Sequence, residues 1–242
     1  VTIGDVTVNE GDGTASVPVT LSVPSSVDTV IDIVTTTGTA GTSDYTATTI
    51  QVTIPAGQTT VNVVIPITDD LIDEPNEKFT VNGTLVSGTI DAANSDFIGE
   101  VTIVDNDATP RVTIGDVTVN EGDGTASVPV TLSVPSSVDT VIDIVTTTGT
   151  AGTSDYTATT IQVTIPAGQT TVNVVIPITD DLIDEPNEKF TVNGTLVSGT
   201  IDAANSDFIG EVTIVDNDAT PTVTIGDVTV NEGDGTASVP VT

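Results

Sequence analysis

The sequence repeats itself over most of its length. Residues 1–110 recur without a substitution as residues 112–221, and a third copy runs from Val223 to Thr242, so the period is 111 residues. The residue before each new copy differs, Arg111 in one case and Thr222 in the other. Solenoid units are much shorter, about 20–45 residues, whereas a unit of this length can bury its own core. We therefore expect a tandem array of independent domains.

The repeat also sets the expected domain boundaries. The last copy holds at most the first two strands of a domain, which is too little to bury a core, and we expect it to be the visible part of a longer chain. Complete domains are predicted at residues 1–107 and 112–218, linkers at 108–111 and 219–222, and an incomplete copy at 223–242.

The chain is strongly acidic and lacks cysteine. It has 3 Lys and Arg residues against 35 Asp and Glu, a formal net charge of −32, and no Cys, Met, Trp or His. This charge excludes the basic surface of a nucleic-acid-binding protein and disfavours anionic membranes. No apolar run approaches the roughly 18 residues of a membrane helix, so we expect no membrane insertion. The expected partners are cations and neighbouring repeats of the same chain.

Each copy alternates β-branched and polar residues in short runs separated by Gly, Pro, Asn and Asp, which indicates half-buried strands. Seven such runs predict an all-β chain of tandem immunoglobulin-like, seven-stranded antiparallel β-sandwiches, and the missing Cys and Trp exclude the antibody type. Tyr45 and Phe79 are expected in the core. In the first copy the predicted strands are Ile3 to Asn9, Thr14 to Leu21, Val27 to Thr36, Thr48 to Ile54, Thr59 to Ile67, Lys78 to Ser87 and Gly99 to Val104.

The strand count predicts where the acidic residues gather. If consecutive strands run up and down, strands one, three, five and seven all end at the same pole of the sandwich. Most carboxylates of a repeat follow these four strands, and we call this end the acidic pole. Its segments are Asn9–Asp12, Thr42–Tyr45, Asp69–Glu77 and Asp105–Asp107.

A cluster of carboxylates at one pole must splay apart, take up protons or hold cations, and cations are the simplest answer. Two carboxylates about 5 Å apart repel by roughly 3 kcal/mol at an effective dielectric constant of 20, and the net stability of a domain is only about 5–15 kcal/mol. The ligands are hard oxygens without imidazole or thiolate, which favours calcium, and after it magnesium, over zinc or copper. We expect about two to four calcium ions at each acidic pole. The competing interpretation is that the acidic loops are simply solvated surface.

Several segments of the repeat, taken together, resemble the Calx-beta domain. They are VNEGDG at Val8–Gly13, AGTSDYTA at Ala40–Ala47, the PAGQ turn at Pro55, ITDDLIDEPNEKF at Ile67–Phe79 and VTIVDND at Val101–Asp107. This calcium-binding β-sandwich is named from sodium/calcium exchangers and also occurs in bacterial surface proteins. The resemblance covers the whole repeat.

The resemblance implies a set of calcium ligands in each complete copy. Asn106 stands where the exchanger's sensor domain has a central Asp, and Leu71 where that domain has a third acid, which lowers the expected number of ions. We interpret Asp12 and Asp73 as surface charge. The implied ligands are Glu10, Asp44, Asp69, Asp70, Glu74, Glu77, Asp105 and Asp107 in the first copy, and Glu121, Asp155, Asp180, Asp181, Glu185, Glu188, Asp216 and Asp218 in the second; the third copy has only Glu232.

The place of the last ligands predicts what the cation does. Asp105 and Asp107 lie directly before the linker, so bound calcium is expected to stiffen the joint, and Pro110 favours an extended connector. Because the copies are identical, length itself is the expected function, that of a monomeric, extended rod acting as a spacer. The arrangement resembles the extender region of large bacterial RTX adhesins exported by type I secretion, which places the chain outside a bacterial cell.

Three alternatives remain open from the sequence. A calcium-sensing regulatory module like that of the exchangers would respond near micromolar calcium, whereas an extracellular module would respond at about 0.1–1 mM. An enzyme using the Asp69–Asp70 and Glu74–Glu77 carboxylates as a glycosidase pair is disfavoured, because the chain has no His or Cys and few aromatic residues to stack on a sugar. We expect no enzymatic activity. Direct adhesion through the faces of the repeats is the third alternative, although the exposed Thr, Ser and Val side chains offer no distinctive binding pocket.

Overall fold

The computed structural model describes all residues, 1–242, and is all-β, as predicted. Its helices are five single 3-10 turns of three residues each, and none of them has the length or apolar character that crossing a membrane would require. The chain divides into two compact units, whose main bodies are residues 1–110 and 111–242.

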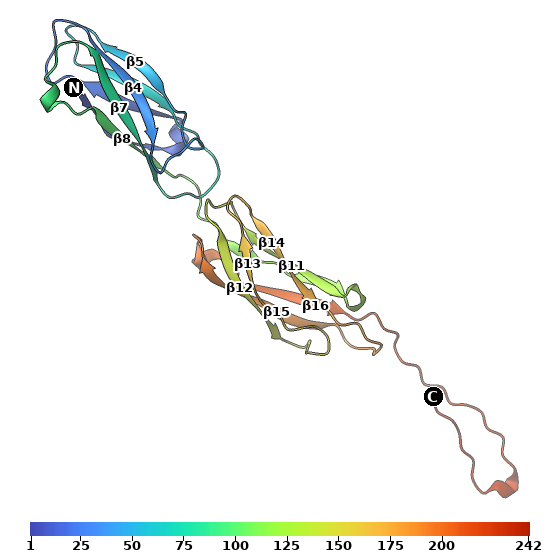
Figure 1. Ribbon diagram of the computed structural model, residues 1–242. Coiled ribbons are helices and arrows are strands. Elements are labelled where there is room, and N and C mark those ends of the chain that lie inside the picture. The colour runs from blue at the N-terminus through green and yellow to red at the C-terminus, as the bar shows by residue number, and fades with distance from the viewer. The chain divides into compact units, whose positions relative to one another are not determined.

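The first unit is a sandwich of two β-sheets. Strands β4, β5, β7 and β8 lie side by side in one layer (Figure 1). The five-stranded sheet has the order β2-β8-β7-β4-β5 and the three-stranded sheet the order β1-β3-β6. The bounds are β1 (Thr2–Ile3), β2 (Val6–Asn9), β3 (Thr14–Thr20), β4 (Thr29–Thr37), β5 (Thr49–Ile54), β6 (Thr60–Pro66), β7 (Glu77–Ser87) and β8 (Ile98–Val104), with 3-10 turns η1 (Glu10–Asp12) and η2 (Ala92–Asn94).

The first predicted strand is divided between the two sheets. Its first part, β1, pairs with β3 antiparallel, and its second part, β2, pairs with β8 in parallel, so one pairing departs from the predicted antiparallel pattern. The crossing occurs at Gly4, whose N–H donates to the Pro18 carbonyl at 2.9 Å. A Cβ at Gly4 would lie 2.8 Å from Pro18 Cγ, so this close approach needs glycine. Alternation alone could not reveal the change of sheet.

The core lies between the two sheets and is built from alternate strand residues. Ala15, Val17 and Val19 on β3 are fully buried, and Tyr45 and Phe79 are 2% and 0% exposed, which confirms their prediction as core residues. The two rings stack with centroids 3.9 Å apart and an interplanar angle of 7°. This packing anchors the loop before β5 next to the start of β7, and both segments carry acidic residues of the acidic pole.

The second unit repeats this architecture strand for strand. Its sheets have the orders β10-β16-β15-β12-β13 and β14-β11-β9. The bounds are β9 (Val112–Ile114), β10 (Val117–Asn120), β11 (Thr125–Leu132), β12 (Thr140–Thr148), β13 (Thr160–Ile165), β14 (Thr171–Pro177), β15 (Glu188–Ser198) and β16 (Ile209–Val215), with turns η3 (Glu121–Asp123) and η4 (Ala203–Asn205).

The third copy, residues 223–242, forms no strand. It contains the turn η5 (Glu232–Asp234) and one isolated bridge between Ile225 and Val241. All of its residues except Gly226 are exposed. The copy therefore buries no core, as its length predicts.

Candidate metal centre

The four acidic segments of the first unit follow β2, β4, β6 and β8. Two groups of three carboxylates form there. In each group, one oxygen from every residue lies within 4.8 Å of the corresponding oxygens of the other two. We call Glu10, Asp70 and Asp107 the first cluster, and Asp44, Glu74 and Glu77 the second cluster.

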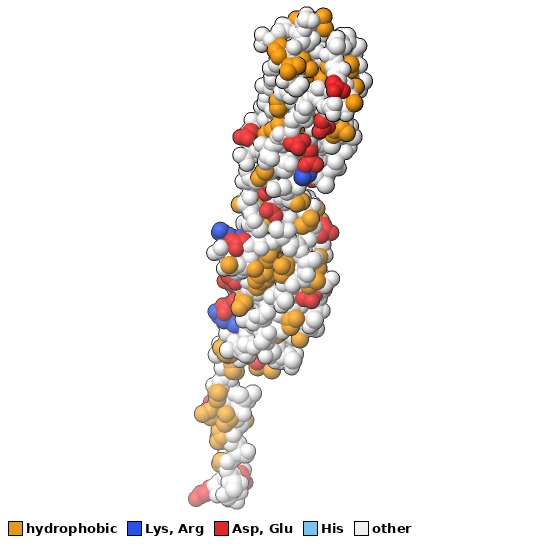
Figure 2. Space-filling model, turned by 90° about the vertical axis from the view of Figure 1, so that its left-hand side faces the viewer, with side chains coloured by type: hydrophobic (Ala, Val, Ile, Leu, Met, Phe, Trp, Pro, Cys, Tyr) orange, Lys and Arg blue, Asp and Glu red, His pale blue; other side chains and the backbone are white.

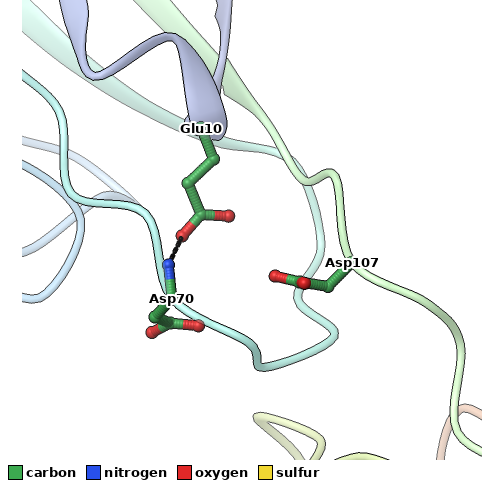
Figure 3. Close-up of side chains that lie close together, drawn as sticks. All are labelled: Glu10, Asp70 and Asp107. Atoms are coloured by element: carbon green, nitrogen blue, oxygen red, sulfur yellow. Dashed lines mark hydrogen bonds between the residues drawn. The ribbon is translucent and has the colours of Figure 1, made fainter.

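The first cluster joins three segments that are far apart in the sequence. Figure 3 shows Glu10 descending from η1, Asp70 on the loop after β6, and Asp107 on the segment after β8. The Glu10 side chain is 5% exposed, and its Oε1 accepts a hydrogen bond from the Asp70 N–H at 3.2 Å. This bond ties η1 to the loop and leaves the second Glu10 oxygen, Oε2, facing the other carboxylates.

Local sequence places Glu10. Asn9 caps the turn η1, and its N–H donates to the Asp12 carboxylate at 2.9 Å, which forms a capping box. Gly13 then ends the turn with φ of 69°, a left-handed conformation that favours glycine. The Asp12 carboxylate is thus engaged in capping the turn.

The second cluster lies around a small cavity. The cavity measures about 10 Å³ and is lined by five carboxylate residues together with Pro75 and Ile103. That volume is close to the space that one water-sized probe occupies. The five residues are Glu10, Asp44, Glu74, Glu77 and Asp105, so one residue of the first cluster, Glu10, also lines this cavity.

Three carboxylate oxygens at the acidic pole are buried and have no hydrogen-bond partner. They are Glu77 Oε2, Asp105 Oδ1 and Asp107 Oδ2. A buried charged group without a partner is costly, and native proteins pair such groups or coordinate them to metal. Two of the three corresponding oxygens in the second unit, Asp216 Oδ1 and Asp218 Oδ2, are also unpartnered. These oxygens suit a hard cation such as calcium, because the cation binds carboxylate oxygens directly and takes the place of a hydrogen-bond donor.

The pKa values show how strongly the glutamates resist ionisation. Burial, together with the negative charges of neighbouring aspartates, raises the pKa of Glu10 from 4.5 to about 7, although the Asp70 N–H opposes the shift. Burial, followed by the hydrogen bond and charge of Asp44, raises the pKa of Glu77 to about 7. Burial also raises the pKa values of Glu74, Asp105 and Asp107. At neutral pH the pole therefore takes up either protons or cations.

Asp44 behaves differently. Burial acts to raise its pKa, but hydrogen bonds from the Ser43 side chain, the Gly41 N–H and the Glu77 side chain outweigh burial, so the pKa of Asp44 is lowered. Asp44 and Glu77, which are hydrogen-bonded to each other, therefore have pKa values shifted in opposite directions.

The other acids of this pole lie outside the two clusters. Asp105 lines the cavity, and its N–H donates to Asn76 Oδ1 at 3.3 Å. Asp69 is exposed and accepts a hydrogen bond from the Asn106 amide at 3.3 Å. Sequence reasoning did not single out Asn76, which supports the segment after β8; its position inside the acidic segment 69–77 was the available signal.

The second unit reproduces both clusters. Its groups are Glu121, Asp181 and Asp218, and Asp155, Glu185 and Glu188. A second cavity of about 10 Å³ is lined by Glu121, Asp155, Glu185, Pro186, Glu188, Ile214 and Asp216. Burial, with the hydrogen bond and charge of Asp155, raises the pKa of Glu188 to about 7. Glu232 of the third copy is exposed and joins no cluster.

No basic side chain neutralises either pole. The chain has three Lys and Arg residues, and each pairs elsewhere: Lys78 with Glu100, Lys189 with Glu211, and Arg111 with Asp202. In Figure 2 the few basic side chains lie next to acidic ones on the visible face. Counterions for the clusters must therefore come from solution.

Comparison with known proteins identifies a domain family and several similar structures. The Calx-beta domain family matches residues 2–107 and again residues 105–218. Among solved structures, the chain is similar to the calcium-binding domain CBD12 of CALX1.1, with 20% identity over 80% of this chain and 79% of that chain and a TM-score of 0.41. The apo form of the Calx CBD1 domain has 22% identity over 46% of this chain and 100% of that chain, with a TM-score of 0.40. No curated protein matches the sequence.

Proposed function

The chain belongs to the Calx-beta domain family, with two tandem copies, and from this premise we propose that it is a calcium-binding, calcium-stiffened spacer. The observation that carries the calcium proposal is the set of buried carboxylate oxygens without partners at each acidic pole. In the first copy the proposed ligands are the two clusters and Asp105; in the second they are the corresponding residues.

Calcium suits this pole better than magnesium. It takes six to eight oxygens in irregular geometry, whereas magnesium requires a nearly ideal octahedron and retains its waters. The acidic pole offers carboxylates from four separate segments, some of them buried, and this irregular set matches the coordination of calcium. The two clusters in each copy support about two ions per copy, the lower end of the range expected from the sequence.

Calcium binding at this pole would also hold the chain that leaves the domain. Asp107 belongs to the first cluster, and the linker starts at the next residue. Asp73, interpreted from the sequence as surface charge, is hydrogen-bonded to Thr109 of the linker. At the other end of the linker, Arg111 and Ser133 exchange two hydrogen bonds of 2.9 Å, from the Arg111 N–H to Ser133 Oγ and from the Ser133 N–H to the Arg111 carbonyl. Each end of the linker is thus attached to its own unit, which shortens the part of the linker that is free to move.

The proposed biological role is that of an extender in a secreted bacterial surface adhesin. Identical copies provide uniform length rather than a series of different binding sites, and the net charge of −32 suits a medium that is rich in calcium. In this proposal the chain is a monomeric, extended rod outside the cell, which holds terminal binding domains away from the surface.

Thermal unfolding and small-angle scattering test the proposal. In about 5 mM calcium, compared with chelator, we expect a melting temperature higher by about 10 °C or more, because ions that bind only the folded state stabilise it by mass action. The maximum dimension should become longer and better defined. No change in either quantity would contradict the spacer, and a calcium affinity near micromolar rather than about 0.1–1 mM would favour a sensor.

A further inference from the structure

Arg111, the residue before the second copy, contacts that copy through its backbone and through its side chain. Its N–H donates to Ser133 Oγ, and its carbonyl accepts from the Ser133 N–H, both at 2.9 Å. Its Nε donates to Asp202 Oδ2 at 3.4 Å, which is an ion pair. The backbone contacts do not depend on the side chain, whereas the contact with Asp202 requires a basic one.

The backbone contacts continue the three-stranded sheet of the second copy. There β9 begins at Val112 and β11 ends at Leu132, and these two residues pair with each other. In the first copy the corresponding strands are each one residue shorter, so that the outermost pair is Thr2 with Thr20. Arg111 therefore lies next to the end of a regular ladder, which holds its side chain close to the loop between β15 and β16.

The first copy has a pocket at the corresponding place. It measures about 450 Å³, and its lining includes the segment Leu21–Ser26 and Asp91. Ser22 and Asp91 are the counterparts of the two residues that bind Arg111 in the second copy. Asp91 caps the turn η2 here, because its Oδ1 accepts from the Ala93 N–H at 3.1 Å, while its Oδ2 accepts from the Asn94 amide at 2.7 Å.

Asp202 has different partners, although the two loops have the same sequence. Its side chain makes no capping hydrogen bond to η4. Its Oδ2 accepts instead from both the Asn205 amide, at 2.8 Å, and Arg111. A carboxylate forms a stronger hydrogen bond with a charged guanidinium than with a neutral backbone N–H. The loop between β15 and β16 therefore responds to the residue that precedes the copy.

We infer that the end of each repeat opposite the acidic pole carries a binding site for an arginine side chain of the preceding linker. We call it the arginine site. It is formed by Ser133 and Asp202 in the second copy and by Ser22 and Asp91 in the first. The residue before each copy is the position at which the repeats differ, arginine at one junction and threonine at the next. An arginine junction is held through backbone and side chain, whereas a threonine junction keeps only the backbone contacts.

This inference deepens the proposed spacer function. An array of otherwise identical copies would vary the stiffness of its joints through this one position. The arginine site itself does not require calcium, so it can be tested in chelator as well as in calcium.

Spin labelling tests the arginine site, because the chain has no cysteine of its own. A label at Ala203→Cys reports on η4 and one at Ala92→Cys on η2, and both positions are exposed. Arg111→Thr should raise the mobile fraction of the electron paramagnetic resonance spectrum at position 203 by about two- to fivefold, as expected for loss of an exposed ion pair. The spectrum at position 92 should not change. Arg111→Lys should have a smaller effect, because it keeps the charge.

Matched changes in the two copies provide the controls. Asp202→Asn should increase mobility at position 203 more than Asp91→Asn does at position 92, since only the first removes an ion pair. An Ala-Thr-Pro-Arg extension before Val1, copied from residues 108–111, should lower the mobile fraction at position 92 by about two- to fivefold. The extension Ala-Thr-Pro-Thr, copied from residues 219–222, should not.

A distance measurement between the units tests the effect on the joint. Labels at Thr84→Cys and Thr195→Cys place one exposed probe on each unit. In double electron–electron resonance, Arg111→Thr should broaden the distribution of distances, and Arg111→Lys should broaden it less.

Circular dichroism checks that each variant keeps its strand content. The inference would be overturned by equal mobility at position 203 with arginine and threonine at position 111, by extensions that act alike at position 92, or by a distance distribution that does not change. Failure of the proposed function has a different signature, in which calcium changes neither the melting temperature nor the maximum dimension of the unsubstituted chain.

Discussion

Residues 1–20 and residues 223–242 have the same sequence but different structures. In the first copy this segment forms β1, β2, η1 and β3, and Ile3 and Val17 are 2% and 0% exposed. In the third copy, Ile225 and Val239, which correspond to them, are 72% and 46% exposed. The difference arises because β3 pairs with β6 along its whole length, and the third copy has no such partner strand. Alternation predicts a strand, but pairing and burial stabilise it.

One part of the segment keeps its structure in both places. The turn Glu232–Asp234 has the same capping box as η1, with the Asn231 N–H donating to Asp234 Oδ2 at 2.8 Å, and Gly235 has φ of 67°. Glu232, however, is exposed, whereas Glu10 is buried in its cluster. The turn is therefore a local structure, whereas the metal centre requires the complete sandwich.

Completing the third copy should produce the largest change. A chain extended after Thr242 by the sequence of residues 21–110 should bury Ile225 and Val239 as in the other copies. Amide hydrogens in residues 223–242 should change from nearly unprotected to as protected as those of a folded domain. That protection corresponds to a free energy of unfolding of about 5–15 kcal/mol. Hydrogen-exchange mass spectrometry measures this, and exchange that stays fast would show that the segment is not a domain start.

Replacing the corresponding isoleucine by alanine in the first copy and in the third copy should change the free energy of unfolding by unequal amounts. Ile3→Ala should lower the free energy of unfolding of the first unit by about 2–5 kcal/mol, because it leaves a cavity in a packed core. Ile225→Ala is the matched control and should change it by less than about 0.5 kcal/mol, since the side chain is exposed. Denaturant unfolding monitored by circular dichroism provides both values. Equal effects would contradict the assignment of residues 223–242 as unpacked.

The two complete units should respond to pH in the absence of calcium. Glu10, Glu77 and Glu188 have pKa values raised from 4.5 to about 7, so the folded state binds more protons than the unfolded state between these values. The stability that these three glutamates contribute is therefore fully present below about pH 4.5 and is lost as the pH rises through about 7. In chelator, the melting temperature should rise when the pH falls from about 8 to 6.

Two controls sharpen the pH experiment. Glu10→Gln with Glu77→Gln should flatten the dependence of the first unit, because neutral amides replace the titrating groups. Saturating calcium should remove the dependence or reverse it, because protons then compete with the ion. A melting temperature that is independent of pH in chelator would contradict the raised pKa values of these glutamates.

Removing residues 223–242 should have the smallest effect. The segment buries no side chain of its own, so a chain ending at Thr222 should melt within about 1 °C of the full chain. Differential scanning calorimetry measures this. A clear loss of stability would show that the third copy stabilises the units before it.

Most of the strands and the identity of the acidic segments could be predicted from alternation and turn residues. The division of the first strand could not, because it depends on which strands its two parts meet in the folded domain, β3 for the first part and β8 for the second. The sequence alone also does not tell Asp69 and Asp70 apart, because both are aspartates in the same acidic segment. Only the fold shows that Asp70 faces Glu10 and Asp107 while Asp69 pairs with Asn106.

The sequence by itself determined the tandem repeat, the all-β class, the excess of acidic over basic residues and the local turn around Glu10, because these depend on residue identity and short-range geometry. The tertiary structure decided which carboxylates share a site, which oxygens are buried without partners, and why two identical segments differ. These properties depend on strands and loops far apart in the chain, whose contacts form only when a complete copy folds.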